Sequence, residues 1–147
     1  MTDWNLIVKQ AKAIIGDETN FIANTANISA LLFQELKDIN WAGFYFLKND
    51  ELVLGPFQGK VACVRIPLNR GVCGAAATER KTLIVEDVHK FPGHIACDSA
   101  SNSEIVVPIL KDGELLGVID IDSPLFNRFN EFDKDALEKV AQLIADI

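Results

Sequence analysis

Three cysteines are the residues of this 147-residue sequence with the clearest capacity for chemistry. They are Cys63, Cys73 and Cys97, separated by 10 and 24 residues, and no Cys-x-x-Cys pair occurs among them. A sulfenic acid formed on one cysteine condenses with a second thiol to give a disulfide. Three thiols in one chain therefore favour redox chemistry, whereas their wide spacing argues against a zinc site. We expect no metal and no cofactor.

A predicted β-hairpin adds acidic residues to these thiols. Residues 105–110 and 115–121 are apolar, and the Asp-Gly dipeptide between them favours a tight turn. Pairing the strands about this turn places Glu104 opposite Ile121, so the acids at the outer strand ends share one end of the sheet. Clustered carboxyl groups raise one another's pKa, and a carboxylate also binds an ammonium group. The three acids are Glu104, Asp120 and Asp122.

Each cysteine has a different predicted setting. Cys97 lies in residues 91–103, where Pro-Gly and a polar run predict a loop, and a loop cysteine can meet a substrate. Cys63 falls within an apolar stretch, residues 61–67, that we expect to be a strand, where a buried packing role is common. Cys73 lies near the start of a short predicted helix, where the helix dipole would stabilise a thiolate.

An aromatic strand is predicted over residues 41–47, with the sequence WAGFYFL. Because side chains alternate along a strand, Trp41, Gly43 and Tyr45 lie on one face. This face could simply pack in the core, or it could form an aromatic wall for a small ligand, with Tyr45 supplying a hydroxyl group. Asp120 and Asp122 also alternate with isoleucine, a pattern equally typical of an outward polar face.

The remaining segments predict a single α+β domain over residues 1–147, with a largely antiparallel sheet of about six strands flanked by helices at both chain ends. Apolar residues recur at helical spacing in residues 3–15, 20–36 and 131–144. The predicted strands are residues 41–47, 51–54, 61–67, 82–88, 105–110 and 115–121.

Composition excludes several classes of partner. The net charge of −7 argues against binding to nucleic acid or to an anionic membrane, since both require a basic face. No apolar run reaches the 18 residues of a membrane span, and the N-terminal residues lack the pattern of a signal peptide. We therefore expect a cytoplasmic protein, where the thiols remain reduced.

The element order and five sequence stretches together resemble the small GAF domains, and more narrowly the free methionine-(R)-sulfoxide reductases. The stretches are NWAGFYF, VACVRIP, GVCGAAA, HIACDSAS and GVIDIDSP. The resemblance implies a GAF-like fold and a thiol-dependent reduction of free L-methionine (R)-S-oxide to L-methionine, with thioredoxin as reductant. Family members commonly form dimers, and the amphipathic first helix could serve that purpose.

The resemblance also implies roles for eight residues. Cys97 matches the nucleophile, and its sulfenic acid would condense with Cys63 or Cys73; the sequence leaves open which of the two resolves it. Trp41 and Tyr45 match an aromatic wall of the substrate pocket. The acids at positions 104, 120 and 122 match pocket acids that bind the ammonium group or protonate the sulfoxide oxygen, in an assignment that the sequence leaves open.

Two functions from other classes compete with this interpretation. One is a non-catalytic GAF sensor of a cyclic nucleotide or another small molecule, although the three acids would repel a phosphate. The other is a thiol redox sensor in which disulfide formation is the signal. It accounts for the cysteines but gives the aromatic wall no role.

Overall fold

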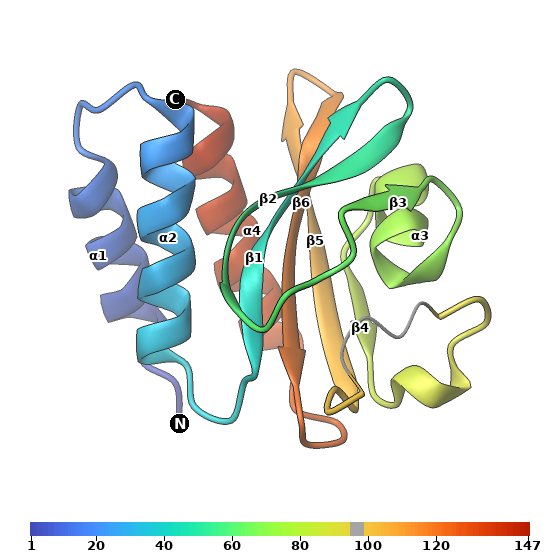
Figure 1. Cartoon of the computed structure of the whole chain (residues 1–147). Helices are drawn as coiled ribbons and strands as arrows, with labels where there is room; N and C mark the ends of the chain where they lie inside the picture. The colour runs from blue at the N-terminus through green and yellow to red at the C-terminus, as the bar shows by residue number, and fades with distance from the viewer. Residues whose placement is uncertain (95–98) are drawn as a thin grey trace.

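The computed structural model describes residues 1–94 and 99–147, which form one curled sheet with helices on both of its faces (Figure 1). The helices are α1 (Trp4–Ile15), α2 (Phe21–Glu35), α3 (Gly71–Glu79), the short 3-10 helix η1 (Val88–Lys90) and α4 (Glu131–Ala145). The strands are β1 (Trp41–Lys48), β2 (Glu51–Gly59), β3 (Arg65–Pro67), β4 (Leu83–Val85), β5 (Ser103–Lys111) and β6 (Glu114–Ser123).

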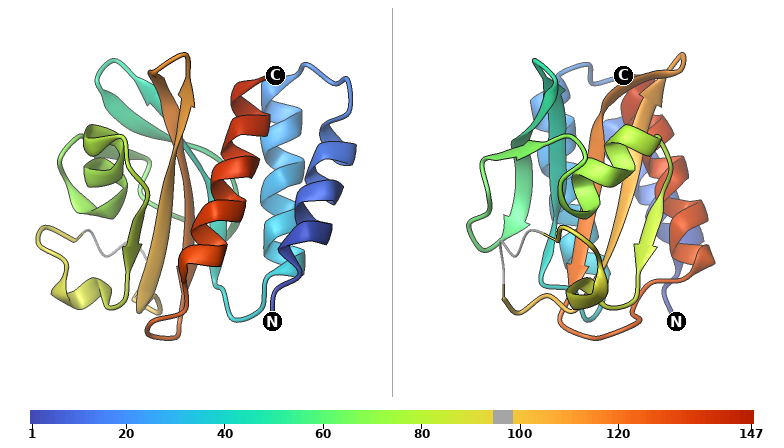
Figure 2. Two further views of the ribbon diagram at one scale, coloured as in Figure 1. Left: turned by 180° about the vertical axis from the view of Figure 1, so that it is seen from behind. Right: turned by 90° about the vertical axis from the view of Figure 1, so that its right-hand side faces the viewer.

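The two faces of the sheet differ: three helices cover one face, and the other face carries the polar residues of the predicted site. Its strand order is β3-β2-β1-β6-β5-β4, and each neighbouring pair is antiparallel. Helices α1, α2 and α4 lie together on one face, whereas α3 lies on the other (Figures 1 and 2). The predicted α+β architecture is confirmed. No helix in the described part of the chain is long and apolar enough to cross a membrane.

Capping residues define where the outer helices begin. The Asp3 carboxylate accepts a hydrogen bond from the Leu6 backbone N–H, 3.2 Å away, at the start of α1. Asn130 and Asp133 form a reciprocal capping box at the start of α4. Asp133 also accepts a 2.8 Å hydrogen bond from the Trp4 indole N–H, so the first and last helices are joined at the same point.

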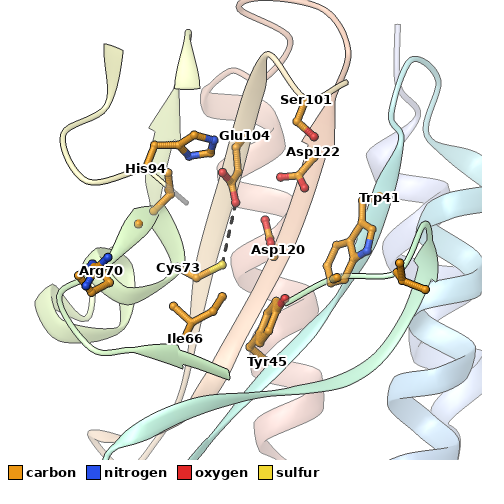
Figure 3. Close-up of a pocket in the computed structure, with 14 residues that line it drawn as sticks. Trp41, Tyr45, Ile66, Arg70, Cys73, His94, Ser101, Glu104, Asp120 and Asp122 are labelled. Carbon is orange, nitrogen blue, oxygen red and sulfur yellow. Dashed lines mark hydrogen bonds between the residues drawn. The ribbon is translucent and has the colours of Figure 1, made fainter. Parts of the chain in front are cut away.

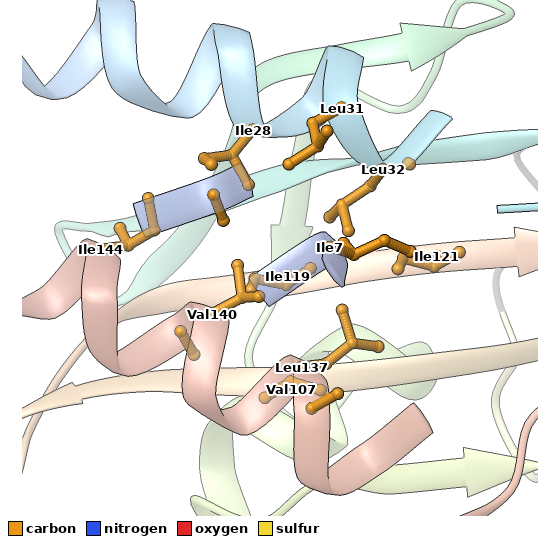
Figure 4. Packing of buried hydrophobic residues seen from close by; sticks show 14 of the residues in the cluster. Ile7, Ile28, Leu31, Leu32, Val107, Ile119, Ile121, Leu137, Val140 and Ile144 are labelled. Atoms are coloured by element: carbon orange, nitrogen blue, oxygen red, sulfur yellow. The ribbon is translucent and has the colours of Figure 1, made fainter. Parts of the chain in front are cut away.

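Alternation along the strands builds a separate apolar cluster on each face. Ile119 and Ile121 of β6 and Val107 of β5 pack under the three helices (Figure 4). Val118 and Val106 of the same strands pack on the opposite face, in the cluster that contains Trp41, Tyr45 and Cys73. The face carrying Asp120 and Asp122 is therefore the α3 face, and it is covered rather than turned toward solvent.

The hairpin register differs by one residue from the predicted one. Glu104 pairs with Asp122, and Ile105 pairs with Ile121. The pairing is Leu110 with Leu115 near the turn but Ile109 with Gly117 beyond it, so β6 carries one extra residue at a β-bulge. The bulge shifts every later pair and aligns Glu104 directly with an acid instead of with Ile121.

The predicted bounds of three strands are wrong. Strand β2 continues through Gly55 and Pro56 to Gly59, because its register against β1 shifts at a bulge there and the proline needs no ladder hydrogen bond. The predicted strand over residues 61–67 is reduced to β3, Arg65–Pro67, so Cys63 lies in a loop rather than in a strand. The predicted strand 82–88 is likewise reduced to Leu83–Val85 and is followed by η1.

Candidate functional site

A pocket lies on the α3 face of the sheet, and most of the predicted site residues line it (Figure 3). Strands β1, β5 and β6 form its floor, and the start of α3 and the loop before β3 contribute its walls. The predicted residues that line it are Trp41, Tyr45, Cys73, Glu104, Asp120 and Asp122. The structure therefore brings one thiol, that of Cys73, together with three acids and two aromatic rings in one pocket.

The three acids come together because two neighbouring strands present them on one face. Glu104 lies opposite Asp122 across the β5–β6 pair, and Asp120 lies opposite Val106. The side chains of Glu104 and Asp120 are nearly enclosed, since the two residues are 7% and 6% exposed. One carboxyl oxygen of Asp120, Oδ1, is buried without a hydrogen-bond partner among the described residues.

Burial favours the protonated forms of the acids in this cluster. Burial raises the pKa of Glu104 well above its usual value, and the charges of Asp120 and Asp122 raise it further. Burial also raises the pKa of Asp120, although hydrogen bonds from its neighbours act in the opposite direction. A hydrogen bond links Glu104 to Asp120 and raises the pKa of the former, so we place the shared proton on Glu104.

Cys73 is a buried, protonated thiol next to these acids. Its residue is 4% exposed, and its Sγ donates a long hydrogen bond of 3.9 Å to Glu104 Oε2. Burial is the largest cause that raises the pKa of Cys73, followed by the charges of Asp120 and Glu104. The expected stabilisation of a thiolate by the α3 dipole is therefore wrong, because a helix terminus contributes only about 0.3–1 kcal/mol and burial outweighs it.

Cys73, Glu104 and Asp120 also have the spacing of a metal-binding group, since one donor atom from each lies within 4.8 Å of the others. Burial raises the pKa of both carboxyl groups, which favours their protonated forms over the charged forms that a metal ion would need. We therefore interpret the three side chains as groups that hold protons rather than as ligands of a metal ion.

The aromatic wall is present, but its polar atoms point to the backbone. The Trp41 and Tyr45 rings stack with centroids 5.9 Å apart. Trp41 Nε1 donates to the carbonyl oxygen of Lys60 at 3.1 Å, and the Tyr45 hydroxyl donates to the carbonyl oxygen of Cys63 at 2.8 Å. Burial raises the pKa of Tyr45, so its phenol remains a neutral donor. The Tyr45 hydroxyl thus gives its proton to the protein backbone, and a role toward a ligand stays a prediction.

The two other cysteines differ in what the structure describes. Cys63 is half-buried in the loop between β2 and β3 and is disulfide-bonded, whereas Cys73 has a free thiol. Cys97 lies outside the described residues, so its assignment as nucleophile stays a prediction.

The pocket includes residues that the sequence interpretation did not assign to it, among them His94, Ser101 and Arg70. Burial lowers the pKa of His94, and the charge of His89 lowers it further, so the imidazole of His94 is neutral at pH 7. The Ser101 hydroxyl accepts a 3.1 Å hydrogen bond from Asn40 Nδ2. Two sequence features could have indicated that these residues belong to the site. His94 lies three positions before Cys97, and Arg70 precedes the small residues at the start of α3.

Comparison with known proteins gives consistent matches. The GAF domain family matches residues 23–147. The free methionine-R-sulfoxide reductase of Escherichia coli (strain K12) is 58% identical over 132 residues, which cover 89% of this chain and 80% of that protein. Protein YtsP of Bacillus subtilis (strain 168) is 57% identical over 144 residues, 97% of this chain and 88% of that protein.

A solved structure extends the match to three dimensions. The fRMsr of Staphylococcus aureus, in complex with its substrate, superposes with a TM-score of 0.95 at 53% identity. The match covers 99% of this chain and 95% of that one. The likeness therefore includes the strands, α3 and the polar face, rather than the helical side alone.

Proposed function

Because this chain belongs to the GAF-domain family of free methionine-R-sulfoxide reductases, we propose that it reduces free L-methionine (R)-S-oxide to L-methionine in the pocket on the α3 face. The observation that carries the proposal is the buried Glu104–Asp120 pair, which lines the same pocket as the Trp41–Tyr45 wall and whose pKa values burial raises. A sulfoxide needs a proton on its oxygen as sulfur is attacked, and this pair holds one.

The reaction proceeds in two thiol steps. The Cys97 thiolate attacks the sulfoxide sulfur and the sulfoxide oxygen takes up a proton. The sulfur–oxygen bond of the substrate then breaks, the hydroxyl passes to the Cys97 sulfur, and methionine leaves with Cys97 as a sulfenic acid. A second thiol then displaces the hydroxyl as water and forms a disulfide. A dithiol protein, which we propose to be thioredoxin, reduces this disulfide and returns the enzyme to its starting state.

We assign different roles to the acids according to how deeply each is buried. Glu104, which carries the shared proton, donates it to the sulfoxide oxygen. Asp122 is half-buried and is therefore closer to solvent than the enclosed Glu104 and Asp120. We assign Asp122 to the substrate ammonium, since a charge-assisted hydrogen bond between the two selects a free amino acid over a residue in a peptide chain.

The described thiols support Cys63 as the resolving residue. Cys63 already takes part in a disulfide, whereas Cys73 is free, buried and held in its protonated form. A thiol attacks as its thiolate, so a raised pKa makes Cys73 a poor nucleophile. We propose that Cys73 packs against the acids and does not resolve the sulfenic acid.

The Trp41 and Tyr45 rings form the apolar side of the proposed substrate site. The thioether and methyl group of methionine pack favourably against aromatic rings.

We further propose that residues 1–147 act as one domain without a bound cofactor. We also propose that the protein functions in the cytoplasm, where thioredoxin is available, and that it forms a homodimer.

The test is a turnover assay with defined sulfoxides. The protein is incubated with free L-methionine (R)-S-oxide and dithiothreitol, and the methionine formed is measured by chromatography. The controls are the S epimer and the N-acetylated R epimer, which lacks the ammonium group. We expect methionine from the free R epimer alone. Absence of methionine while the thiols remain titratable would rule out the reductase function.

A further inference from the structure

We propose that the Tyr45 hydroxyl is a positioning group for Cys63, which it holds where this thiol forms its disulfide. The contact is the 2.8 Å hydrogen bond from the phenol to the carbonyl oxygen of Cys63 (Figure 3 shows the Tyr45 ring in the pocket). The proposal deepens the proposed function, because it depends on that function for the role of Cys63 as resolving thiol. Tyr45 would then serve two steps, with its ring in the substrate wall and its hydroxyl in resolution.

The segment that Tyr45 restrains is the Cys63 loop, residues 60–64 between β2 and β3. Trp41 Nε1 donates to the carbonyl oxygen of Lys60 at 3.1 Å, where the loop begins. The backbone N–H of Leu54 donates to the carbonyl oxygen of Val64 at 2.9 Å, where the loop ends. The Tyr45 contact lies between these two and acts on the cysteine itself.

Apolar packing contributes little to holding this loop. Val61 and Val64 of this loop are 87% and 60% exposed, and Ala62 and Cys63 are only partly buried against the cluster on the α3 face. A loop with exposed side chains gains little from burial, so its placement depends on the hydrogen bonds to its backbone. The Tyr45 phenol is well suited to this task, because the residue is 2% exposed and its ring is fixed by stacking on Trp41.

Disulfide formation is sensitive to this placement. The two Cβ atoms of a disulfide must approach to about 3.5–4.5 Å, and small departures store strain. In the resolving step the Cys63 sulfur donates an electron pair to the sulfenic sulfur, the sulfur–oxygen bond breaks, and hydroxide leaves with the thiol proton as water. No further oxidant is needed, and the rate depends on how often the two sulfur atoms are in range.

The test uses Tyr45→Phe, which removes one oxygen and keeps the ring. The equilibrium between the dithiol and disulfide forms is titrated with reduced and oxidised dithiothreitol, so the measurement needs no methionine sulfoxide. Loss of one buried hydrogen bond to the loop lowers the stability of the disulfide about tenfold, which raises the reduction potential by roughly 30 mV. The rate at which sulfenic acid converts to disulfide, followed by trapping with dimedone, falls by a similar factor.

Ser29→Ala is the matched control, because it also removes a hydroxyl that lies within hydrogen-bond distance of backbone carbonyl oxygens, the nearer being that of Thr25 at 2.7 Å. Ser29 Oγ lies 3.1 Å from the carbonyl oxygen of Pro56, on the helical side of the sheet and away from the Cys63 loop. The control should leave the disulfide equilibrium within twofold of the wild type. Tyr45→Phe within twofold of the wild type, or Ser29→Ala with the same tenfold change, would overturn the proposal. Failure of the proposed function would instead appear as no methionine formed by the wild type.

Discussion

Replacing Glu104 with glutamine should slow sulfoxide reduction and, at the same time, stabilise the fold at neutral and alkaline pH. Glutamine keeps the size and shape of the side chain but has no acidic proton to give. Glu104 is 7% exposed, and burial, followed by the charges of Asp120 and Asp122, raises its pKa. The same environment that makes it a proton donor near neutral pH therefore destabilises its charged form.

The sign of the stability effect follows from proton linkage. In the unfolded chain a glutamic acid ionises with a pKa of about 4.3, whereas the folded Glu104 holds its proton to higher pH. The folded state thus binds more protons in this range, and the free energy of unfolding falls as pH rises from the unfolded pKa through the folded pKa. Each unit of difference costs about 1.4 kcal/mol above both pKa values. Glu104→Gln removes this contribution, so its stability should fall less with pH.

The effect on catalysis follows from the loss of a general acid. General acid–base catalysis typically contributes a factor of about 10²–10⁴, and the glutamine amide retains only hydrogen-bond donation. We expect the first-turnover rate of methionine formation to drop about 10²-fold at pH 7. The wild-type rate should also decline at alkaline pH as Glu104 loses its proton. The residual rate of the variant should not show this decline.

The assay combines rapid quenching of a single turnover with urea unfolding between pH 5 and pH 9. Glu138→Gln is the control, because Glu138 is an exposed acid whose Oε2 accepts a 2.6 Å hydrogen bond from Thr82 on the far side of the sheet. A Glu104→Gln variant that retains more than half of the wild-type rate would refute the assignment of the proton donor. An unchanged slope of stability against pH would refute the burial argument.

Further predictions concern the thiols, the ammonium site and the sheet. Cys97→Ser should yield no methionine even in a single turnover, Cys63→Ser should yield about one equivalent and then stop with thioredoxin, and Cys73→Ser should continue to turn over; a stalled Cys73→Ser would reassign the resolving thiol. Asp122→Asn should raise KM for the free amino acid about 10- to 100-fold through loss of a charge-assisted hydrogen bond, and an unchanged KM would place the ammonium elsewhere. Gly117→Ala should lower the free energy of unfolding in urea by about 1–3 kcal/mol, because its Cβ would lie 2.2 Å from the Tyr45 carbonyl oxygen; a loss under 0.5 kcal/mol would contradict it.

Local sequence patterns determined most of the architecture. Apolar spacing gave the helices, and the Asp-Gly turn gave the hairpin that carries the acids, because both patterns depend on neighbours close in the chain. Alternation alone assigned Trp41 and Tyr45 to one face, which the structure confirms. The family resemblance gave the reaction, and the comparisons support it.

The tertiary structure decided how the candidate site residues are arranged and how deeply they are buried. One extra residue in β6 aligned Glu104 with Asp122, and no local pattern marked that bulge. Enclosure by α3 and the Cys63 loop raised the pKa values of the acids and of Cys73, whereas the local helix dipole had predicted a thiolate. The Tyr45 hydroxyl binds a backbone carbonyl 18 positions away in the chain. Desolvation and long-range hydrogen bonds depend on which segments the fold brings together, and the spacing of residues along a sequence does not contain that information.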